Sequence, residues 1–213
     1  MKATKKGAGR PVARNGTKRA DIINSATRLF AEKGHTETTI RDISADSGAG
    51  LGLITYYFKD KEAILNEVLM DNLKDLGPVF AAEVNNEGSY AARLKRIYSV
   101  YCDFGEENPL GTLLLLRGIL RLIEGEANPI VGFFAARLEA IRKVLDGGRE
   151  AGEFRKIDTE FAPLMLVSGL MSQAINNLAN ERYPDAFPST MSSRDNTKLF
   201  ENMILRGLLL KKE

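Results

Sequence analysis

The sequence predicts an all-α protein of about nine helices, and three observations support that prediction. Apolar residues recur at three- and four-residue spacings along most of the chain, which is the period of an amphipathic helix. Capping residues and prolines stand where helices would begin, and glycines stand where they would end. Beyond Pro78 no alternating strand pattern appears.

Composition limits the class of protein further. The chain has 213 residues, 44% of them hydrophobic, enough for one large or two modest domains with a sizeable core. A single cysteine, Cys102, excludes an internal disulfide, and a single histidine, His35, provides no metal cluster. We therefore expect no metal, no cofactor and no enzyme activity. The most apolar run, residues 110–123, is too short to span a membrane, and no signal peptide is evident, so we expect a cytoplasmic protein.

The charge is distributed unevenly along the chain. Residues 1–61 hold 12 Lys and Arg against 6 Asp and Glu, whereas residues 62–213 hold 18 against 22. A basic amino-terminal part joined to a mildly acidic remainder favours a polyanionic partner at one end only.

The first 16 residues are basic, contain Pro and Gly, and lack periodicity, so we expect a disordered arm. Such an arm could contact phosphates or reach a minor groove with Arg10 or Arg14. A merely solubilising tail is the alternative.

The first long helix is expected to begin at Thr17 or Lys18 and to end at Lys33, before Gly34. Its apolar stripe would pack against two shorter helices that follow. The buried residues of this small domain are predicted to be Ile22, Ala26, Leu29, Phe30, Ile40, Ile43, Ile54 and Phe58.

Residues 38–62 (TTIRDISADSGAGLGLITYYFKDKE) predict a helix-turn-helix. Thr39 would cap a helix over residues 40–47, with Asp42 completing a capping box. Ser47-Gly-Ala-Gly50 would break that helix, since glycine takes positive φ without steric cost. A second short helix would run from Leu51 to about Phe58. Such a second helix can lie in a DNA major groove.

The stretch from Arg19 to about Leu69 resembles the TetR family of transcriptional regulators. The matching features are Ile22-Ile23, Leu29-Phe-Ala-Glu-Lys-Gly34, Thr38-Thr-Ile-Arg-Asp-Ile43, Gly48 and Gly52-Leu-Ile-Thr-Tyr-Tyr-Phe-Lys-Asp-Lys-Glu62. This resemblance implies a three-helix DNA-binding domain at residues 17–61 and a larger effector-binding and dimerisation domain at residues 62–213.

The resemblance also implies which residues contact DNA. Thr39 and Lys61 would each meet a phosphate, Gly50 and Leu51 would approach the bases, and Gly52 would permit close approach of the backbone. Thr55 stands where the family most often has Tyr, and Gly50-Leu51 replaces a commoner polar pair, so Leu51 would read bases through apolar contact only. Packing of Tyr57 against the first helix is an alternative to its contact with the DNA backbone. The predicted DNA-binding set is Thr39, Gly50, Leu51, Gly52, Thr55, Tyr56, Tyr57 and Lys61.

Beyond the helix-turn-helix, start and stop signals delimit the remaining helices. Asp60 is expected to cap a helix over residues 61–76 that ends at Gly77-Pro78. Asn108-Pro109 and Asn128-Pro129 each place a capping residue before a proline, and Asp158 is expected to cap a long helix. The predicted ranges are residues 79–86, 89–107, 110–124, 130–150, 158–180 and 193–210.

The last two predicted long helices are apolar over more than one face, so they need cover on both sides. In TetR-like proteins the equivalent pair forms a four-helix bundle with its mate, which implies a homodimer. An ordinary monomer core is the alternative. The predicted interface residues are Leu164, Val167, Met171, Ile175, Leu199, Met203, Ile204 and Leu208.

Helices between about residues 60 and 152 are expected to enclose a pocket for a small-molecule effector. Arg117, set among leucines, could form a buried ion pair, extend to the surface, or neutralise an acidic ligand. For each single candidate, a place in the plain core or on the surface is the favoured alternative. The predicted ligand-binding residues are Tyr98, Tyr101, Phe104, Leu114, Arg117, Phe133, Phe134 and Arg137.

We thus expect a homodimeric, ligand-responsive regulator, most simply a repressor that a small molecule releases from a double-stranded DNA operator. Two other classes are a helical DNA-binding protein without effector control and a helical small-molecule enzyme. Against the enzyme stands the lack of a nucleophile–base pair, metal set or phosphate loop in the sequence.

Overall fold

The computed structural model describes residues 15–125 and 129–209. Within these residues the regular structure is helical, apart from one isolated antiparallel bridge between Phe154 and Leu209, so the predicted all-α class is confirmed. The chain divides into two compact units between Leu65 and Asn66, inside helix α4 (Lys61–Leu73). They are the amino-terminal unit, up to Leu65, and the carboxy-terminal unit, from Asn66 onward.

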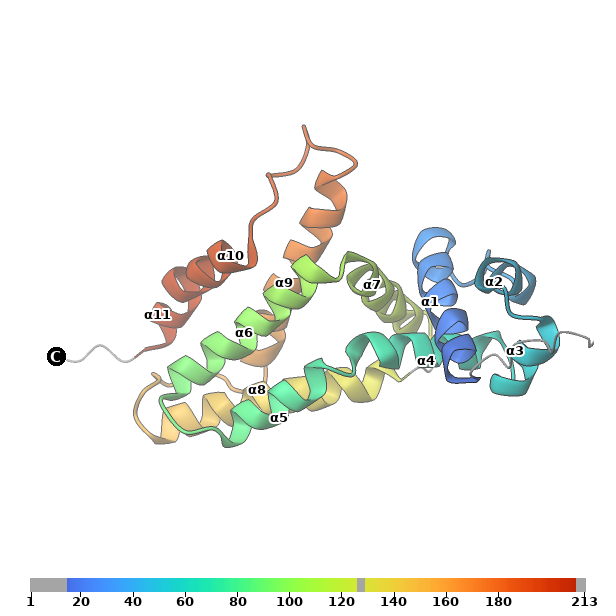
Figure 1. The fold of residues 1–213 in the computed structure, drawn as a ribbon. Helices are drawn as coiled ribbons and strands as arrows, with labels where there is room; N and C mark the ends of the chain where they lie inside the picture. The colour runs from blue at the N-terminus through green and yellow to red at the C-terminus, as the bar shows by residue number, and fades with distance from the viewer. Residues whose placement is uncertain (1–14, 126–128, 210–213) are drawn as a thin grey trace, which may run out of the picture. The chain divides into compact units, whose positions relative to one another are not determined.

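The amino-terminal unit contains α1 (Asn15–Lys33), α2 (Ile40–Ser47) and α3 (Leu51–Tyr57), which pack on one another (Figure 1). α1 begins two residues before the predicted start, since the first turn of a helix needs no intrahelical partner for its N–H groups. The predicted arm otherwise lies outside the described residues, and so do Arg10 and Arg14. All predicted core residues are buried except Ile40, which begins α2, has no preceding turn to cover it, and is half-buried.

The carboxy-terminal unit is arranged around α6 (Tyr90–Glu107), which packs against five other α-helices and against a π-helical turn near the end of the chain. The five α-helices are α5 (Leu76–Asn85), α7 (Pro109–Ile123), α8 (Ile130–Glu150), α9 (Ala162–Asn180) and α10 (Ser193–Phe200). As predicted, Asn108 caps α7: its Oδ1 accepts a hydrogen bond from the Gly111 N–H at 2.9 Å. The other predicted cap, Asn128, lies outside the described residues. No helix in residues 15–125 or 129–209 has the length and apolar character needed to cross a membrane.

Two helix starts differ from the prediction. α4 ends at Leu73, and Gly77-Pro78 lies in the first turn of α5 instead of between two helices. Proline fits there because the missing N–H has no intrahelical partner in a first turn. α9 begins only at Ala162, since the Asp158 carboxylate accepts hydrogen bonds from the Glu160 and Phe161 N–H groups in a turn before the helix.

The final helix is interrupted. After α10 the chain forms a π-helical turn, η1 (Glu201–Leu205), and a last short turn, α11 (Arg206–Leu208). The prediction of one α-helix to Leu210 was therefore wrong. At this end the Arg155 N–H donates to the Leu208 carbonyl at 2.9 Å, beside the Phe154–Leu209 bridge. These contacts bind the end of the helix to the segment after α8.

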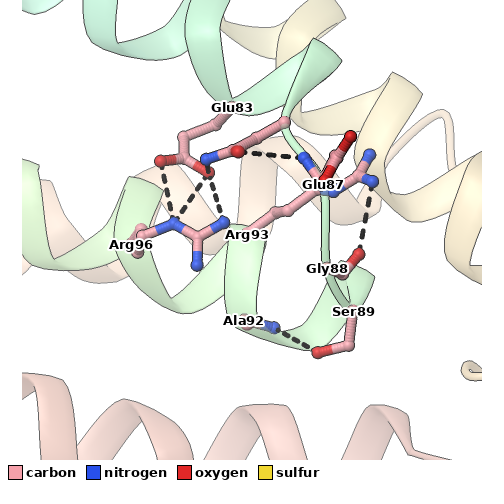
Figure 2. A network of polar contacts seen from close by, with 8 residues as sticks. Glu83, Glu87, Gly88, Ser89, Ala92, Arg93 and Arg96 are labelled. Carbon is pink, nitrogen blue, oxygen red and sulfur yellow. Dashed lines mark hydrogen bonds and ion pairs between the residues drawn. The ribbon is translucent and has the colours of Figure 1, made fainter.

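The corner between α5 and α6 is held by polar contacts (Figure 2). The buried Glu83 carboxylate accepts two hydrogen bonds from Arg96 Nε, at 2.8 and 2.9 Å. Arg93 donates to the Gly88 carbonyl at 3.2 Å, and Ser89 caps α6. The buried carboxylate of this unit thus has a cationic partner that contacts both of its oxygens, which offsets the cost of burying it.

Candidate functional site

The helix-turn-helix is set by a capping box and one left-handed residue. Thr39 Oγ1 accepts from the Asp42 N–H at 3.1 Å, and Asp42 Oδ2 accepts from the Thr39 N–H at 2.8 Å. The Thr39 hydroxyl, which donates to Asp42 Oδ2 at 2.6 Å, and after it the Thr39 N–H hold the pKa of the Asp42 carboxyl below its usual value. Gly48 ends α2 with φ of 62°, whereas Gly50 caps α3 with an ordinary φ of −62°. Only Gly48 therefore uses the conformational freedom that glycine has at both positions.

α3 presents one buried and one outward face. Ile54 is fully buried, whereas Leu51, Gly52 and Thr55 are exposed and Tyr56 is 77% exposed. α3, with the sequence LGLITYY, has no charged residue. The predicted base-reading residues therefore form one accessible and uncharged surface.

Besides Thr39, whose hydroxyl donates to Asp42 Oδ2, two of the other predicted DNA contacts already have partners within the protein. Lys61 Nζ donates to the carbonyl oxygens of His35 at 2.7 Å, Thr38 at 2.8 Å and Thr36 at 3.4 Å. It therefore fastens the connection between α1 and α2. Tyr57 is half-buried, and its ring lies 5.2 Å from that of Tyr56 in an edge-to-face arrangement.

A polar cluster between α1 and α2 was missed by sequence reasoning. The Asp46 carboxylate accepts short hydrogen bonds from Ser25 Oγ and from the Arg28 guanidinium. The Ser25 hydroxyl, followed by Arg28, keeps the pKa of Asp46 below its usual value. Ser25 and Arg28 lie 21 and 18 residues before Asp46, which is too far for a local sequence pattern to predict these contacts.

The predicted effector residues separate into two aromatic groups in the carboxy-terminal unit. Tyr98 stacks on Phe200, with 4.0 Å between ring centroids. Tyr101 contacts Phe80 edge-to-face at 4.9 Å. Phe80 was not predicted to line a pocket, since no local pattern reveals that α5 meets α6 at this point. Leu114 is buried in the core.

Arg137 is the most unusual side chain of the second group. It is only 6% exposed, and its guanidinium carbon lies 3.8 Å from the ring centroid of Phe133 and 4.9 Å from that of Phe80. Its Nε lacks a hydrogen-bond partner, and no carboxylate in the described part of the chain pairs with it. Burial lowers the pKa of Arg137. The sequence singled out Arg117 instead, which is only half-buried, although its Nε too is buried without a hydrogen bond.

A small cavity of about 40 Å³ lies beside this group. Tyr101, Phe104 and Phe134 line it, as predicted for a pocket, together with Leu115 and two residues expected at the dimer interface, Val167 and Met171. The aromatic group and α9 therefore share one wall of apolar side chains.

The other predicted interface residues are mostly exposed. Met203 is 69% exposed, and Leu164, Ile175, Leu199 and Ile204 are exposed as well. Val167 is buried, and Met171 and Leu208 are half-buried. Helix α9 and the segment from α10 to α11 thus carry several exposed large apolar side chains.

Comparisons with known proteins bear on these two units. A family profile described as bacterial regulatory proteins, tetR family, matches residues 22–68. The HTH-type transcriptional repressor KstR2 of Rhodococcus jostii (strain RHA1) is 25% identical over 147 residues, which are 68% of this chain and 72% of that protein.

Two solved structures share the fold. The TetR family transcriptional regulator PfmR from Thermus thermophilus has a TM-score of 0.71 at 24% identity, over 92% of this chain and 98% of that one. FadR from Bacillus subtilis, in complex with stearoyl-CoA, has a TM-score of 0.71 at 16% identity, over 89% and 99%. These likenesses lead to one conclusion: residues 22–68 match the tetR family of bacterial regulatory proteins, and the chain shares the fold of the TetR family regulator PfmR.

Proposed function

We propose that the protein is a homodimeric repressor that reads an operator with α3 and is released by a small molecule bound in the carboxy-terminal unit. The observation that carries the DNA-binding part is the exposed, uncharged face of α3, mounted on a unit whose turns are held by capping and by Lys61. An exposed helix on a fixed support suits the major groove.

The surface of α3 predicts how bases would be read. Without Arg, Lys, Asn or Gln, α3 itself cannot form the bidentate hydrogen bonds that select guanine or adenine. Leu51 offers an apolar contact for a thymine methyl group, and Thr55 and Tyr56 offer hydroxyl groups. Phosphate contacts would then come from basic residues elsewhere in the amino-terminal unit.

Selection of bound sequences from random DNA tests this function directly. We expect a palindromic site, and Thr55→Ala or Tyr56→Ala should weaken specific binding by up to about 10-fold, because a single hydrogen bond contributes roughly 0.5–1.5 kcal/mol. Thermal stability should remain unchanged, since both side chains are exposed. Tyr183→Ala, at an exposed tyrosine of the carboxy-terminal unit, is the matched control. Uniform coating of DNA without a preferred site would favour the DNA-binding protein without effector control.

Replacing thymine by deoxyuridine in the selected site tests the apolar contact. The change removes the methyl group and keeps every hydrogen-bonding group of the base. We expect weaker binding by the unmodified protein and no such sensitivity in Leu51→Ala, measured by titration of labelled duplexes. Equal binding of both duplexes by the unmodified protein would contradict a role for Leu51 in reading thymine.

Homodimerisation is supported by the exposed apolar residues of α9 and the last helical turns. Burying such a surface against a second copy would remove it from water. We expect a dimer in sedimentation experiments, and Met203→Glu should shift it toward monomer. A single subunit at micromolar concentration would contradict the proposal.

Effector control is supported by the cavity and the buried polar groups beside it. FadR, which shares the fold, was solved with stearoyl-CoA, so the fold accommodates a small molecule. A ligand that prefers the conformation mismatched to the operator would lower DNA affinity, typically by about 5- to 150-fold. Release of the selected duplex by fractionated cell metabolites measures that coupling.

A further inference from the structure

Arg137 carries a positive charge into an aromatic environment without a counter-ion among the described residues. Burial lowers its pKa, but a guanidinium stays protonated at neutral pH. The rings of Phe80 and Phe133 offset part of the cost through cation–π contact. Their faces are only weak hydrogen-bond acceptors, and Nε has no nitrogen or oxygen partner. The site is therefore short of an acceptor that carries negative charge.

Two further features surround the guanidinium. The Tyr101 hydroxyl is buried without a hydrogen-bond partner, and its ring lies against Phe80, as Arg137 does. Gly77 of α5 borders the site: a β-carbon built there would lie 3.4 Å from a terminal nitrogen of Arg137. Two buried donors thus converge on one aromatic group, and a residue without a side chain stands next to it.

The apolar cavity continues from this group. Tyr101 lines the cavity, and so does Phe134, whose ring lies 5.9 Å from that of Phe133. At about 40 Å³ the cavity has room for little more than a water molecule. Met171 and Met191 also line it, and methionine side chains rearrange easily, so an apolar group can enlarge it at modest cost.

We propose that Arg137 and Tyr101 bind the anionic head of an amphipathic ligand whose apolar body enlarges the adjoining cavity. The head is a carboxylate or a phosphate, both of which accept hydrogen bonds from a guanidinium and a hydroxyl. This inference rests on the proposed effector function and names the chemical class of the effector. It replaces Arg117 by Arg137 as the cation that faces the ligand.

Three probes with the same chain length test the subsite on the full-length protein: octanoate, octyl phosphate and 1-octanol. Calorimetric titration should show that at least one anion binds about 10- to 100-fold more tightly than the alcohol, as expected for charge-assisted hydrogen bonds. The preferred anion identifies the head as carboxylate or phosphate. If neither anion binds better than the alcohol, including the case in which no probe binds, the proposal is overturned.

Arg137→Met is the test variant, because methionine keeps the length and apolar stem without the charge. It should bind all three probes equally. Arg142→Met, which removes an exposed arginine of the same helix, should keep the preference for the anion. If Arg137→Met retains the preference, the subsite lies elsewhere and the assignment fails.

Thermal unfolding without any probe separates a ligand-binding role from a purely structural one. A cation without an acceptor stabilises little, so Arg137→Met should unfold at the same temperature or higher. A fall of more than about 4 °C would mean that the cation–π contacts hold the fold, and would overturn the proposal.

Operator release distinguishes this failure from failure of the repressor function. Release of the selected duplex by a neutral metabolite, without any anion preference, would refute the subsite and leave the proposed function intact. Absence of a selected duplex would refute the function itself.

Discussion

The two units of the protein differ in how they treat buried polar groups. In the amino-terminal unit, Thr38 is fully buried and its hydroxyl donates to the Gly34 carbonyl at 2.7 Å. Lys61 donates hydrogen bonds to three carbonyl groups in the connection between α1 and α2. In the carboxy-terminal unit, Arg137 Nε and the Tyr101 hydroxyl are buried without partners. Among the described residues, Thr38 and Lys61 thus have their hydrogen bonds formed, whereas Arg137 and Tyr101 retain unused hydrogen-bonding capacity.

The difference is consistent with the division of labour that we propose. A DNA-reading helix gains from a support that does not rearrange on binding, because ordering costs reduce affinity. In a ligand site, unpaired groups can form hydrogen bonds that exist only when the ligand is bound. Such bonds can make the ligand bind one conformation more tightly than the other, and this difference in affinity is what shifts the conformational equilibrium. Substitutions of Thr38 and Lys61 should therefore cost stability, whereas substitutions of Arg137 and Tyr101 should cost little.

The largest effect is expected for Lys61→Met. The change removes the donor shared by the carbonyl groups of His35, Thr36 and Thr38, and should lower the free energy of unfolding by about 2–3 kcal/mol. Lys59→Met, at an exposed lysine two residues earlier, is the control. Urea unfolding measures both. Equal stability of the two variants, with weaker DNA binding by Lys61→Met alone, would instead support the phosphate contact inferred from the family resemblance.

Thr38→Val should have the next largest effect. Valine fills the same space but leaves the Gly34 carbonyl without its 2.7 Å donor, so we expect a loss of about 1–2 kcal/mol in the same assay. A neutral result would show that this buried hydroxyl contributes no more than an apolar group, and the contrast between the units would weaken.

A smaller effect is expected from Asp46 and appears only with pH. Its folded-state pKa lies below the ordinary 3.8, through the Ser25 hydroxyl first and Arg28 second. The stabilisation it contributes is therefore present above about pH 4 and is lost as the pH falls through the lower folded-state value. The stability gap between the unmodified protein and Asp46→Asn should close on acidification, and Ser25→Ala should narrow it at pH 7. A gap that does not change with pH would contradict this account.

The smallest effect is expected for Tyr101→Phe in the carboxy-terminal unit. The hydroxyl has no partner to lose, so stability should change by no more than about 0.5 kcal/mol, or rise slightly. Set beside Thr38→Val, this variant tests the comparison directly. A loss as large as that of Thr38→Val would show that the hydroxyl is engaged and that the units do not differ.

Much of the fold was predictable because helical signals act over a few residues. The capping box of Thr39 and Asp42, the asparagine cap of α7 and the bounds of α8 all follow from short patterns. The exceptions arose where a signal has two uses. The Gly77-Pro78 pair predicts the end of a helix, but proline is also compatible with the first turn of one. In the structure the pair lies in the first turn of α5.

The candidate sites were predictable only in part. The outward face of α3 follows from its period, since burying Ile54 leaves Leu51, Thr55 and Tyr56 on the other side. The ammonium of Lys61 was assigned to phosphate, because no pattern reveals carbonyl partners 23 to 26 residues away. Val167 and Met171 were assigned to the interface alone, although both line the cavity.

By itself the sequence determined the helical class, the helix-turn-helix and the face of α3 that is left open, because period and capping are local properties of the chain. Only the tertiary structure showed that Arg137 is more deeply buried than Arg117. Both are arginines among apolar residues, and their burial depends on which helices meet around them. The rings of Phe80 in α5 and Phe133 in α8 both lie against Arg137. Phe80 is too far from Arg137 in the sequence for a local pattern to predict that contact.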